Sequence, residues 1–357
     1  MATRGWEVGI LGATGMVGQQ LVRRLAGHPW FRLTWVGASE RSEGRPYRDH
    51  RWLLSGSVPA IAGDLVIEKS IPGRAPQLLF SALDAEAATR LEHEFAAAGH
   101  IVVSNTRTHR LDADVPLIIP EVNPDHLGLV ARQRTARRWS GAIVTNPNCS
   151  TVFLAMVLAA CRSFGPTRAL VTTLQAASGA GHPGVPAWDL LGNVVPFIDG
   201  EDEKIETETR KILGTFSAGA VTAALTVISA QATRVPVLDG HTEAISIEFG
   251  RPPSEAELVS ALGGFSGPPR DIALPSAPPA PMVHLPERDR PQPRLDATRD
   301  GGMAVSVGRV RPCPVLHYKL VALGHNTIRG AAGAAILNAE LLAADGWLAD
   351  GVTPWSS

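Results

Sequence analysis

The N-terminal segment constrains the fold more than any other part of the chain. Val8 to Leu11 has the composition of a short buried strand, and a glycine-rich turn, Gly12 to Gly18, follows it. From Met16 to Leu25 apolar residues recur at helical spacing. A strand, a glycine turn and a helix in this order are typical of a dinucleotide-binding fold, in which a pyrophosphate sits at the helix N-terminus. Glycine spacing alone also suits an ordinary turn, but the helical periodicity behind it favours nucleotide binding.

Apolar strands and helices continue to alternate along the first part of the chain. We expect strands at 33–36, 78–83, 101–105, 115–119 and 142–144. Asp84 is expected to cap a helix over 85–98 that ends at Gly99. This alternation predicts a doubly wound, mostly parallel sheet of the Rossmann type, whose ligands bind at the carboxyl ends of the strands.

Beyond residue 165 the pattern changes to longer strands with few helices between them. We expect strands at 170–174, 221–228, 244–249, 303–310 and 316–322, and helices at 203–213 and 255–262. Together they predict an α+β domain with a mainly antiparallel sheet covered on one face. The proline-rich stretch 268–293 is expected to be an extended arm or a loop, and 330–342 a small-residue helix packed against another helix. The fold class is therefore α/β, with a Rossmann-type parallel sheet and a second, α+β domain.

Composition excludes several classes of function. The 357 residues have a net charge of −1, and charged residues are 19% with both signs mixed, so neither nucleic acid nor a membrane surface is an expected partner. No apolar run approaches the ~20 residues that span a bilayer, and the chain begins almost directly with a strand rather than a secretory leader. Three widely spaced cysteines indicate neither a disulfide framework nor a metal site. A cytoplasmic protein is expected.

Cys149 is the candidate nucleophile. The strand at 142–144 ends in the polar turn 146–148, and an apolar run of helix-forming composition follows the cysteine. Cys149 should therefore lie in the first turn of a helix, where free N–H groups and the helix dipole favour a thiolate. Cys161 and Cys313 lack this setting and are expected to behave as small hydrophobic residues.

The residues after the second strand bear on the coenzyme. Ser39, Arg41 and Ser42 favour the 2′-phosphate of NADP. Glu40 could instead bind the ribose hydroxyls of NAD, but we interpret it as a solvated loop residue. The expected cofactor is NADP.

Later segments add polar candidates. The small residues from Gln175 to Gly181 permit close approach to a ligand or form an ordinary turn. Arg234 suits a carboxylate, and His241, in a loop between two strands, suits acid–base chemistry. The acidic start of a helix at 201–204 is more often a solvated cap than a site. The residues alone thus indicate a dinucleotide enzyme with a candidate cysteine.

Several ordered motifs together point to one enzyme family. The chain resembles aspartate-β-semialdehyde dehydrogenase, in the branch found in archaea and fungi, over nearly its whole length. The matching motifs are 9–18 (GILGATGMVG), 38–42 (ASERS), 114–123 (DVPLIIPEVN), 145–151 (TNPNCST), 175–181 (QAASGAG), 234–241 (RVPVLDGH) and 325–332 (HNTIRGAA). The resemblance implies an NADP-binding domain, 1–148 with 328–357, and a catalytic and dimerisation domain, 149–327.

The resemblance also implies roles for individual residues. Cys149 matches the nucleophile, His241 the acid–base residue, and Gln175 the residue that positions the acyl intermediate. The implied substrate ligands are Arg234 for the α-carboxylate, Glu201 for the amino group, and Arg110, Asn148 and Lys204 for the phosphate. The implied cofactor ligands are Gly12, Ala13, Thr14, Gly15, Met16, Val17, Ser39, Arg41, Ser42, Ser178, Gly179 and Asn326.

The implied reaction is the reversible, NADPH-dependent reductive dephosphorylation of L-4-aspartyl phosphate to L-aspartate 4-semialdehyde, on the route to lysine, threonine and methionine. A homodimer or a homotetramer is implied. A malonyl-CoA reductase of the same fold would keep Cys149 and His241 but needs no acid for an amino group, so Glu201 and Lys204 count against it. N-acetyl-γ-glutamyl-phosphate reductase matches the motifs less well. An inactive nucleotide-binding relative would need neither Cys149 nor His241.

Overall fold

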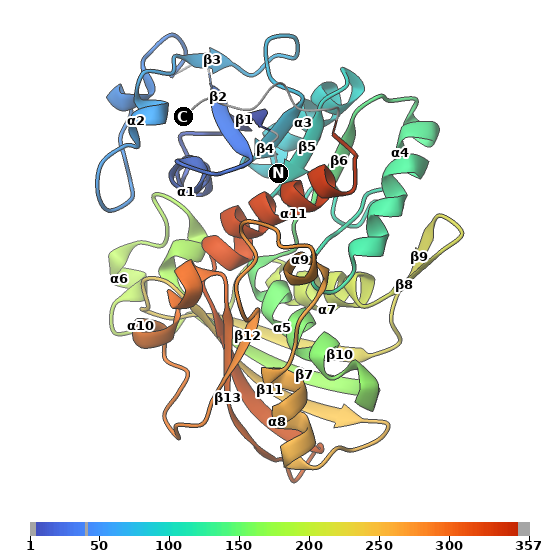
Figure 1. Cartoon of the computed structure of the whole chain (residues 1–357). Helices are drawn as coiled ribbons and strands as arrows, with labels where there is room; N and C mark the ends of the chain where they lie inside the picture. Colours follow the sequence, from blue (N-terminus) through green and yellow to red (C-terminus); the bar gives the residue numbers. More distant parts are fainter. Residues whose placement is uncertain (1–4, 40–41, 349–357) are drawn as a thin grey trace.

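Residues 6–145 contain a six-stranded parallel sheet in the computed structural model, which describes residues 5–39 and 42–348 (Figure 1). The strand order is β3-β2-β1-β4-β5-β6, which is that of a doubly wound dinucleotide-binding sheet. Every neighbouring pair is parallel, as predicted. The strands are β1 (Trp6–Leu11), β2 (Phe31–Ala38), β3 (Ile67–Lys69), β4 (Leu78–Ser81), β5 (Ile101–Ser104) and β6 (Ala142–Thr145).

Helices cover both faces of this sheet because alternate strand residues point to opposite sides. Val8 and Phe80 join a core with α1 and the C-terminal helix α11, whereas Leu79 and Ile143 join a core with α3. In Figure 1, α11 lies between the two sheets of the molecule. The helices of this part are α1 (Met16–Leu25), α2 (Ala60–Gly63), α3 (Ala85–Ala97), α4 (Leu129–Arg137) and α11 (Gly333–Ala344).

The second sheet has the order β10-β7-β11-β14-β13-β12. The three inner pairs are antiparallel, but β10 and β12 run parallel to their neighbours at the two edges. The sheet is therefore mixed, with its antiparallel part in the middle. Its strands are β7 (Pro166–Gln175), β10 (Val227–Arg234), β11 (His241–Phe249), β12 (Met282–Leu285), β13 (Val305–Pro312) and β14 (Tyr318–Gly324), and a separate hairpin is formed by β8 (Thr215–Ser217) and β9 (Ala220–Thr222).

One face of the second sheet is covered and the other carries exposed apolar side chains. Helices α5 (Cys149–Ala160), α7 (Glu201–Ile212) and α8 (Glu255–Gly263) pack on the covered face and share its core. On the strands β7 and β10, Leu170, Leu174 and Val227 remain exposed. Three short helices complete this part, namely α6 (Ala187–Leu190), α9 (Pro268–Asp271) and α10 (Pro293–Asp296). Among the described residues, no helix is long and apolar enough to cross a membrane.

Two expected strands are wrong, and hydrogen bonding explains both. Segment 115–119 forms only an isolated bridge between Leu117 and Thr145, because Pro116 lacks an N–H and the Ile119 N–H is donated to the Asn123 side chain at 2.9 Å. Segment 221–228 is divided between β9 and β10. In the interval, the Ala224 N–H is donated to the Arg210 carbonyl at 2.9 Å rather than to a neighbouring strand.

The proline-rich stretch 268–293 also differs from expectation. It contains the short helix α9 and the edge strand β12, so it is not an extended arm or a loop throughout. Met282 and Leu285 on β12 are buried, and the strand pairs with β13. Burial of these two apolar side chains favours a strand where proline content alone predicts none.

Candidate active site

Cys149 is the first residue of α5 and follows the carboxyl end of β6. Asn148 caps the helix, and its side-chain oxygen accepts the N–H groups of Ser150 at 2.9 Å and Thr151 at 3.2 Å. Gly330 packs directly on the cysteine, because a Cβ on it would lie 2.6 Å from the Cβ of Cys149. The predicted strand–turn–helix junction is confirmed.

The thiolate expected for Cys149 is not favoured by the protein groups around it. Burial, followed by the negative charge of Glu201, raises the pKa of the Cys149 thiol to about 12. The guanidinium groups of Arg110 and Arg234 act in the opposite direction. A helix N-terminus contributes typically 0.3–1 kcal/mol, about 2 in favourable geometry, which is too little to overcome this burial. The resting form at neutral pH is therefore the thiol.

A cavity of about 480 Å³ opens beside Cys149, whose side chain remains partly accessible. The cavity wall combines cationic groups, one carboxylate and two amide side chains. It includes the predicted site residues Arg110, Asn148, Cys149, Gln175, Gly179, Glu201, Lys204 and Arg234. The structure thus brings together residues from both halves of the chain.

Glu201 is the hydrogen-bonding centre of the cavity. Its Oε1 accepts the side-chain amides of Asn148 at 2.6 Å and Gln175 at 3.1 Å, and its Oε2 accepts the Lys204 ammonium at 2.5 Å. Burial opposes ionisation, but Lys204 and the two amides outweigh it and hold the pKa of Glu201 below its ordinary value. The start of α7 is therefore a buried ionic site, not the solvated cap that its composition suggests.

His241 is not a loop residue but the first residue of β11, and its side chain is fully buried. Its Nδ1 accepts the Ala176 N–H at 3.0 Å, which assigns the ring proton of the neutral form to Nε2. Burial and the charge of Arg234 lower its pKa to about 3, so the ring is neutral at physiological pH.

His241 and Arg234 meet behind Gly179. A Cβ on this glycine would lie 2.6 Å from Arg234 Nη1 and 3.1 Å from His241 Nε2, so the close approach requires glycine. Gly179 itself forms part of the cavity wall. His241 does not itself line the cavity, and its Nε2 lies behind the part of the wall that Gly179 forms.

Arg110 is held by Glu208, a residue that the sequence did not point to. Arg110 donates to Glu208 Oε1 at 2.9 Å and to the Asn105 carbonyl at 2.8 Å. The other carboxylate oxygen of Glu208 accepts the backbone N–H of Asn148 at 2.6 Å. One buried carboxylate on α7 thus positions both the arginine and the residue before the nucleophile.

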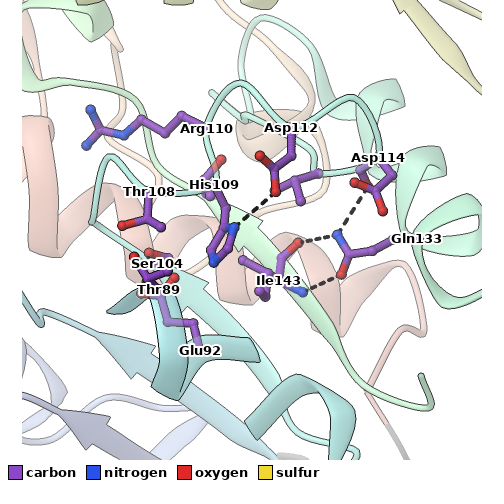
Figure 2. A network of polar contacts seen from close by, with 12 residues as sticks. Thr89, Glu92, Ser104, Thr108, His109, Arg110, Asp112, Asp114, Gln133 and Ile143 are labelled. Carbon is purple, nitrogen blue, oxygen red and sulfur yellow. Dashed lines mark hydrogen bonds and ion pairs between the residues drawn. The ribbon is translucent and has the colours of Figure 1, made fainter. Parts of the chain in front are cut away.

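The loop that carries Arg110 is fixed by further polar contacts. Lys211, also on α7, donates to the carbonyls of Arg110, Asp112 and Val115 at 2.7, 2.8 and 2.8 Å. His109 and Arg137 contact Asp112 at 3.0 and 2.9 Å. Figure 2 shows Arg110 extending away from the acidic side of this loop. The arginine is therefore presented from a rigid support.

A second cavity, of about 630 Å³, lies at the carboxyl ends of β1 to β4. Four predicted cofactor ligands line it, namely Gly12, Thr14, Gly15 and Ser39, together with Lys69, Ser70, Asp84, Arg90 and His182. The N-terminus of α1 and the basic side chains suit a pyrophosphate and a further phosphate, so the residues fit a dinucleotide.

The other predicted cofactor ligands lie around this cavity or outside it. Ala13 is buried, and Met16 and Val17 lie in the first turn of α1. Ser42 donates its N–H to the Ser39 carbonyl at 3.0 Å, whereas Arg41 and Glu40 lie outside the described residues. Asn326 donates to Ser178 Oγ at 2.8 Å, close to Gly179 and the first cavity.

Comparison with known proteins gives the class first. The NAD binding domain of semialdehyde dehydrogenases matches residues 7–130, and the semialdehyde dehydrogenase dimerisation domain matches residues 158–329. Together with the dinucleotide-binding sheet and the cysteine at its edge, these matches define a semialdehyde dehydrogenase.

Comparison with individual proteins identifies the family within this class. The chain is 46% identical over 339 residues to aspartate-semialdehyde dehydrogenase of Archaeoglobus fulgidus, covering 94% of this chain and 98% of the relative. It is 44% identical over 354 residues to that of Saccharomyces cerevisiae, covering 94% and 97%. A crystal structure of the Candida albicans enzyme with NADP superposes with a TM-score of 0.89 at 40% identity, covering 96% of this chain and 100% of that one. The chain belongs to the aspartate-semialdehyde dehydrogenase family.

Proposed function

We propose that this protein catalyses the reversible, NADPH-dependent reductive dephosphorylation of L-4-aspartyl phosphate to L-aspartate 4-semialdehyde. The observation that carries the proposal is the cavity at Cys149, whose wall combines several cationic side chains with one buried carboxylate, Glu201. An amino acid with a phosphorylated side chain has the complementary pattern, since its ammonium lies between a carboxylate and a phosphate.

The charged residues account for substrate binding. Arg234 binds the α-carboxylate through its planar guanidinium, and Glu201 binds the ammonium group. Arg110, Lys204 and the amide of Asn148 bind the phosphate at the other end. Because Glu201 already accepts hydrogen bonds from Lys204 and Asn148, it links the two ends of the site.

The catalytic residues account for the chemistry. Cys149 reacts as its thiolate, which Arg110 and Arg234 stabilise against burial. The sulfur attacks the acyl carbon, phosphate leaves, and a thioester forms on Cys149. When bound, NADPH supplies the hydride that reduces this thioester to a hemithioacetal, which collapses to the semialdehyde. His241 donates its Nε2 proton to the developing oxyanion, and Gln175 orients the acyl group.

NADP would bind in the second cavity, at the carboxyl ends of β1 to β4, and complete the active site at Cys149. Gly12, Thr14 and Gly15 would hold the pyrophosphate at the start of α1. Ser39, with Arg41 and Ser42, would bind the 2′-phosphate. Ser178, Gly179 and Asn326 would contact the coenzyme near Cys149.

We further propose that the protein is a cytoplasmic homodimer, or a tetramer built from dimers. Leu170, Leu174 and Val227 form an exposed apolar patch on the uncovered face of the second sheet, within the residues matched by the dimerisation domain. The proposed domains are 1–148 with 328–357, and 149–327. Packing of α11 in the first core and of α5 in the second supports this division.

A substrate and coenzyme panel tests the function. We expect NADP⁺ reduction that requires both L-aspartate semialdehyde and inorganic phosphate, with kcat/KM for NADP at least about tenfold above that for NAD. Activity with malonyl-CoA but none with semialdehyde and phosphate would overturn the assignment. Equal kcat/KM for the two coenzymes would contradict the role of the 2′-phosphate loop alone.

A further inference from the structure

We propose that Arg107 is a third phosphate-binding cation of the active site and sets the affinity of the enzyme for inorganic phosphate. The proposal rests on the proposed function, because it names a ligand of the same phosphate end. Arg107 belongs to none of the motifs that carry the family resemblance. Its role follows only from where the structure places it.

Arg107 lies in the loop after β5, on the wall of the Cys149 cavity. A Cβ on Gly200 would lie 4.0 Å from Arg107 Nη1 and 3.9 Å from Lys204 Cε. The tips of the two cationic side chains therefore flank the same residue, at the N-terminus of α7. A phosphate placed there would meet both charges and the positive end of the helix.

The other two cations at this end are already engaged inside the protein. Arg110 is bonded to Glu208 and Asn105, and Lys204 is bonded to Glu201. Arg107, by contrast, is exposed, and although its carbonyl accepts the Arg110 N–H at 3.4 Å, its side chain makes no hydrogen bond or ion pair with any residue that the structure describes. Its guanidinium can therefore offer two parallel N–H groups to an oxyanion without breaking an existing contact.

The location of Arg107 also restricts it to the phosphate end of the substrate. The carboxylate-binding candidate Arg234 lies behind Gly179, beside His241, whereas Arg107 lies beside Gly200. The proposal therefore assigns the two arginines to different ends of the substrate, Arg107 with Lys204 to the phosphate and Arg234 to the α-carboxylate. Loss of Arg107 should therefore weaken phosphate binding and leave semialdehyde binding nearly unchanged.

The test compares Arg107→Ser and Arg107→Lys with the wild-type enzyme in the phosphate-dependent oxidation of L-aspartate semialdehyde. Arg132→Ser is the matched control, because Arg132 is an exposed arginine of α4 outside the cavity. We expect KM for phosphate to rise about tenfold in Arg107→Ser and less in Arg107→Lys, with KM for the semialdehyde within about twofold. The control should match the wild type.

A second measurement does not depend on turnover. Phosphate bound beside Cys149 should slow alkylation of this cysteine by iodoacetamide, and the half-protecting phosphate concentration should rise about tenfold in Arg107→Ser. A wild-type enzyme inactive with semialdehyde and phosphate would refute the proposed function, whereas the protection assay would still decide the role of Arg107. Unchanged phosphate dependence in both assays, or an equal rise of both KM values, would overturn the proposal.

Discussion

Helix α5 carries a cysteine at each end, and the Cys149 side chain is partly accessible whereas that of Cys161 is buried. Cys149 is the first residue of the helix and Cys161 follows the last. Burial raises the pKa of both thiols to about 12. The pKa of the thiol therefore does not distinguish a nucleophile from a core residue.

The surroundings of the two sulfur atoms make the difference. Cys149 meets a cavity and the charges of Arg110 and Arg234, and it lies where helix N–H groups point. Cys161 is sealed in the apolar core at the carbonyl end of the helix, where the dipole disfavours a thiolate. Access and nearby positive charge, not the pKa of the resting thiol, therefore mark the reactive end.

The largest expected effect is on turnover. Cys149→Ser should lower kcat for semialdehyde oxidation at least about a thousandfold, because an alcohol is a poorer nucleophile and a poorer leaving group than a thiolate. Stability and NADP binding should be retained, as measured by thermal unfolding and by titration of the coenzyme. A variant that keeps more than a tenth of the wild-type kcat would remove Cys149 from the mechanism.

The second-largest effect is expected in the pH dependence of cysteine alkylation, which should differ between Cys149 and Cys161. Because burial holds the pKa of Cys149 near 12, its thiolate fraction and its rate of reaction with iodoacetamide should rise about tenfold per pH unit, and still rise between pH 9 and 10. An ordinary thiol of pKa about 8.5 would level off there. Site-resolved mass spectrometry is needed, since the partly exposed Cys313 also reacts, whereas Cys161 should remain unmodified. A rate independent of pH above 7 would mean that the helix terminus and the two arginines outweigh burial and lower the pKa of the Cys149 thiol.

A smaller effect is expected when the support of the reactive end is weakened. Glu208→Gln removes the charge that pairs with Arg110 and leaves one acceptor where two are used, so Arg110 and the Asn148 N–H lose alignment. We expect kcat/KM for phosphate to fall about tenfold. Glu203→Gln, on the exposed face of the same helix, is the control and should have no effect. Equal kinetics of the two variants would mean that Glu208 serves packing only.

The sequence predicted the reactive end well because its signals are local. The bounds of α1 are those given by the apolar periodicity, and the cap at Asp84 and the junction at Cys149 each depend on neighbouring residues. Strand 115–119 failed because its hydrogen-bond partners are set by prolines and by the Asn123 side chain.

The residue that supports the site, Glu208, could not be predicted because its contacts are distant in sequence. Glu208 contacts Arg110 and Asn148 across 98 and 60 positions of sequence. An acidic residue on an amphipathic helix is usually solvated, so nothing nearby marked it. The one available signal was spacing, since Glu201, Lys204, Glu208 and Lys211 recur on one face of α7. His241 was likewise placed in the right segment, but its burial depends on the strands that flank it.

The smallest effect is expected at the unreactive end of α5. Cys161→Ala removes one buried sulfur atom from the apolar core and should lower the free energy of unfolding by about 1 kcal/mol, because the core collapses only partly around the lost volume. Urea unfolding at fixed protein concentration measures this loss, and kcat/KM should remain within about twofold of the wild type. A tenfold loss of activity at unchanged stability would mean that Cys161, at the buried end of the helix, also contributes to catalysis. The contrast drawn between the two ends of α5 would then be wrong.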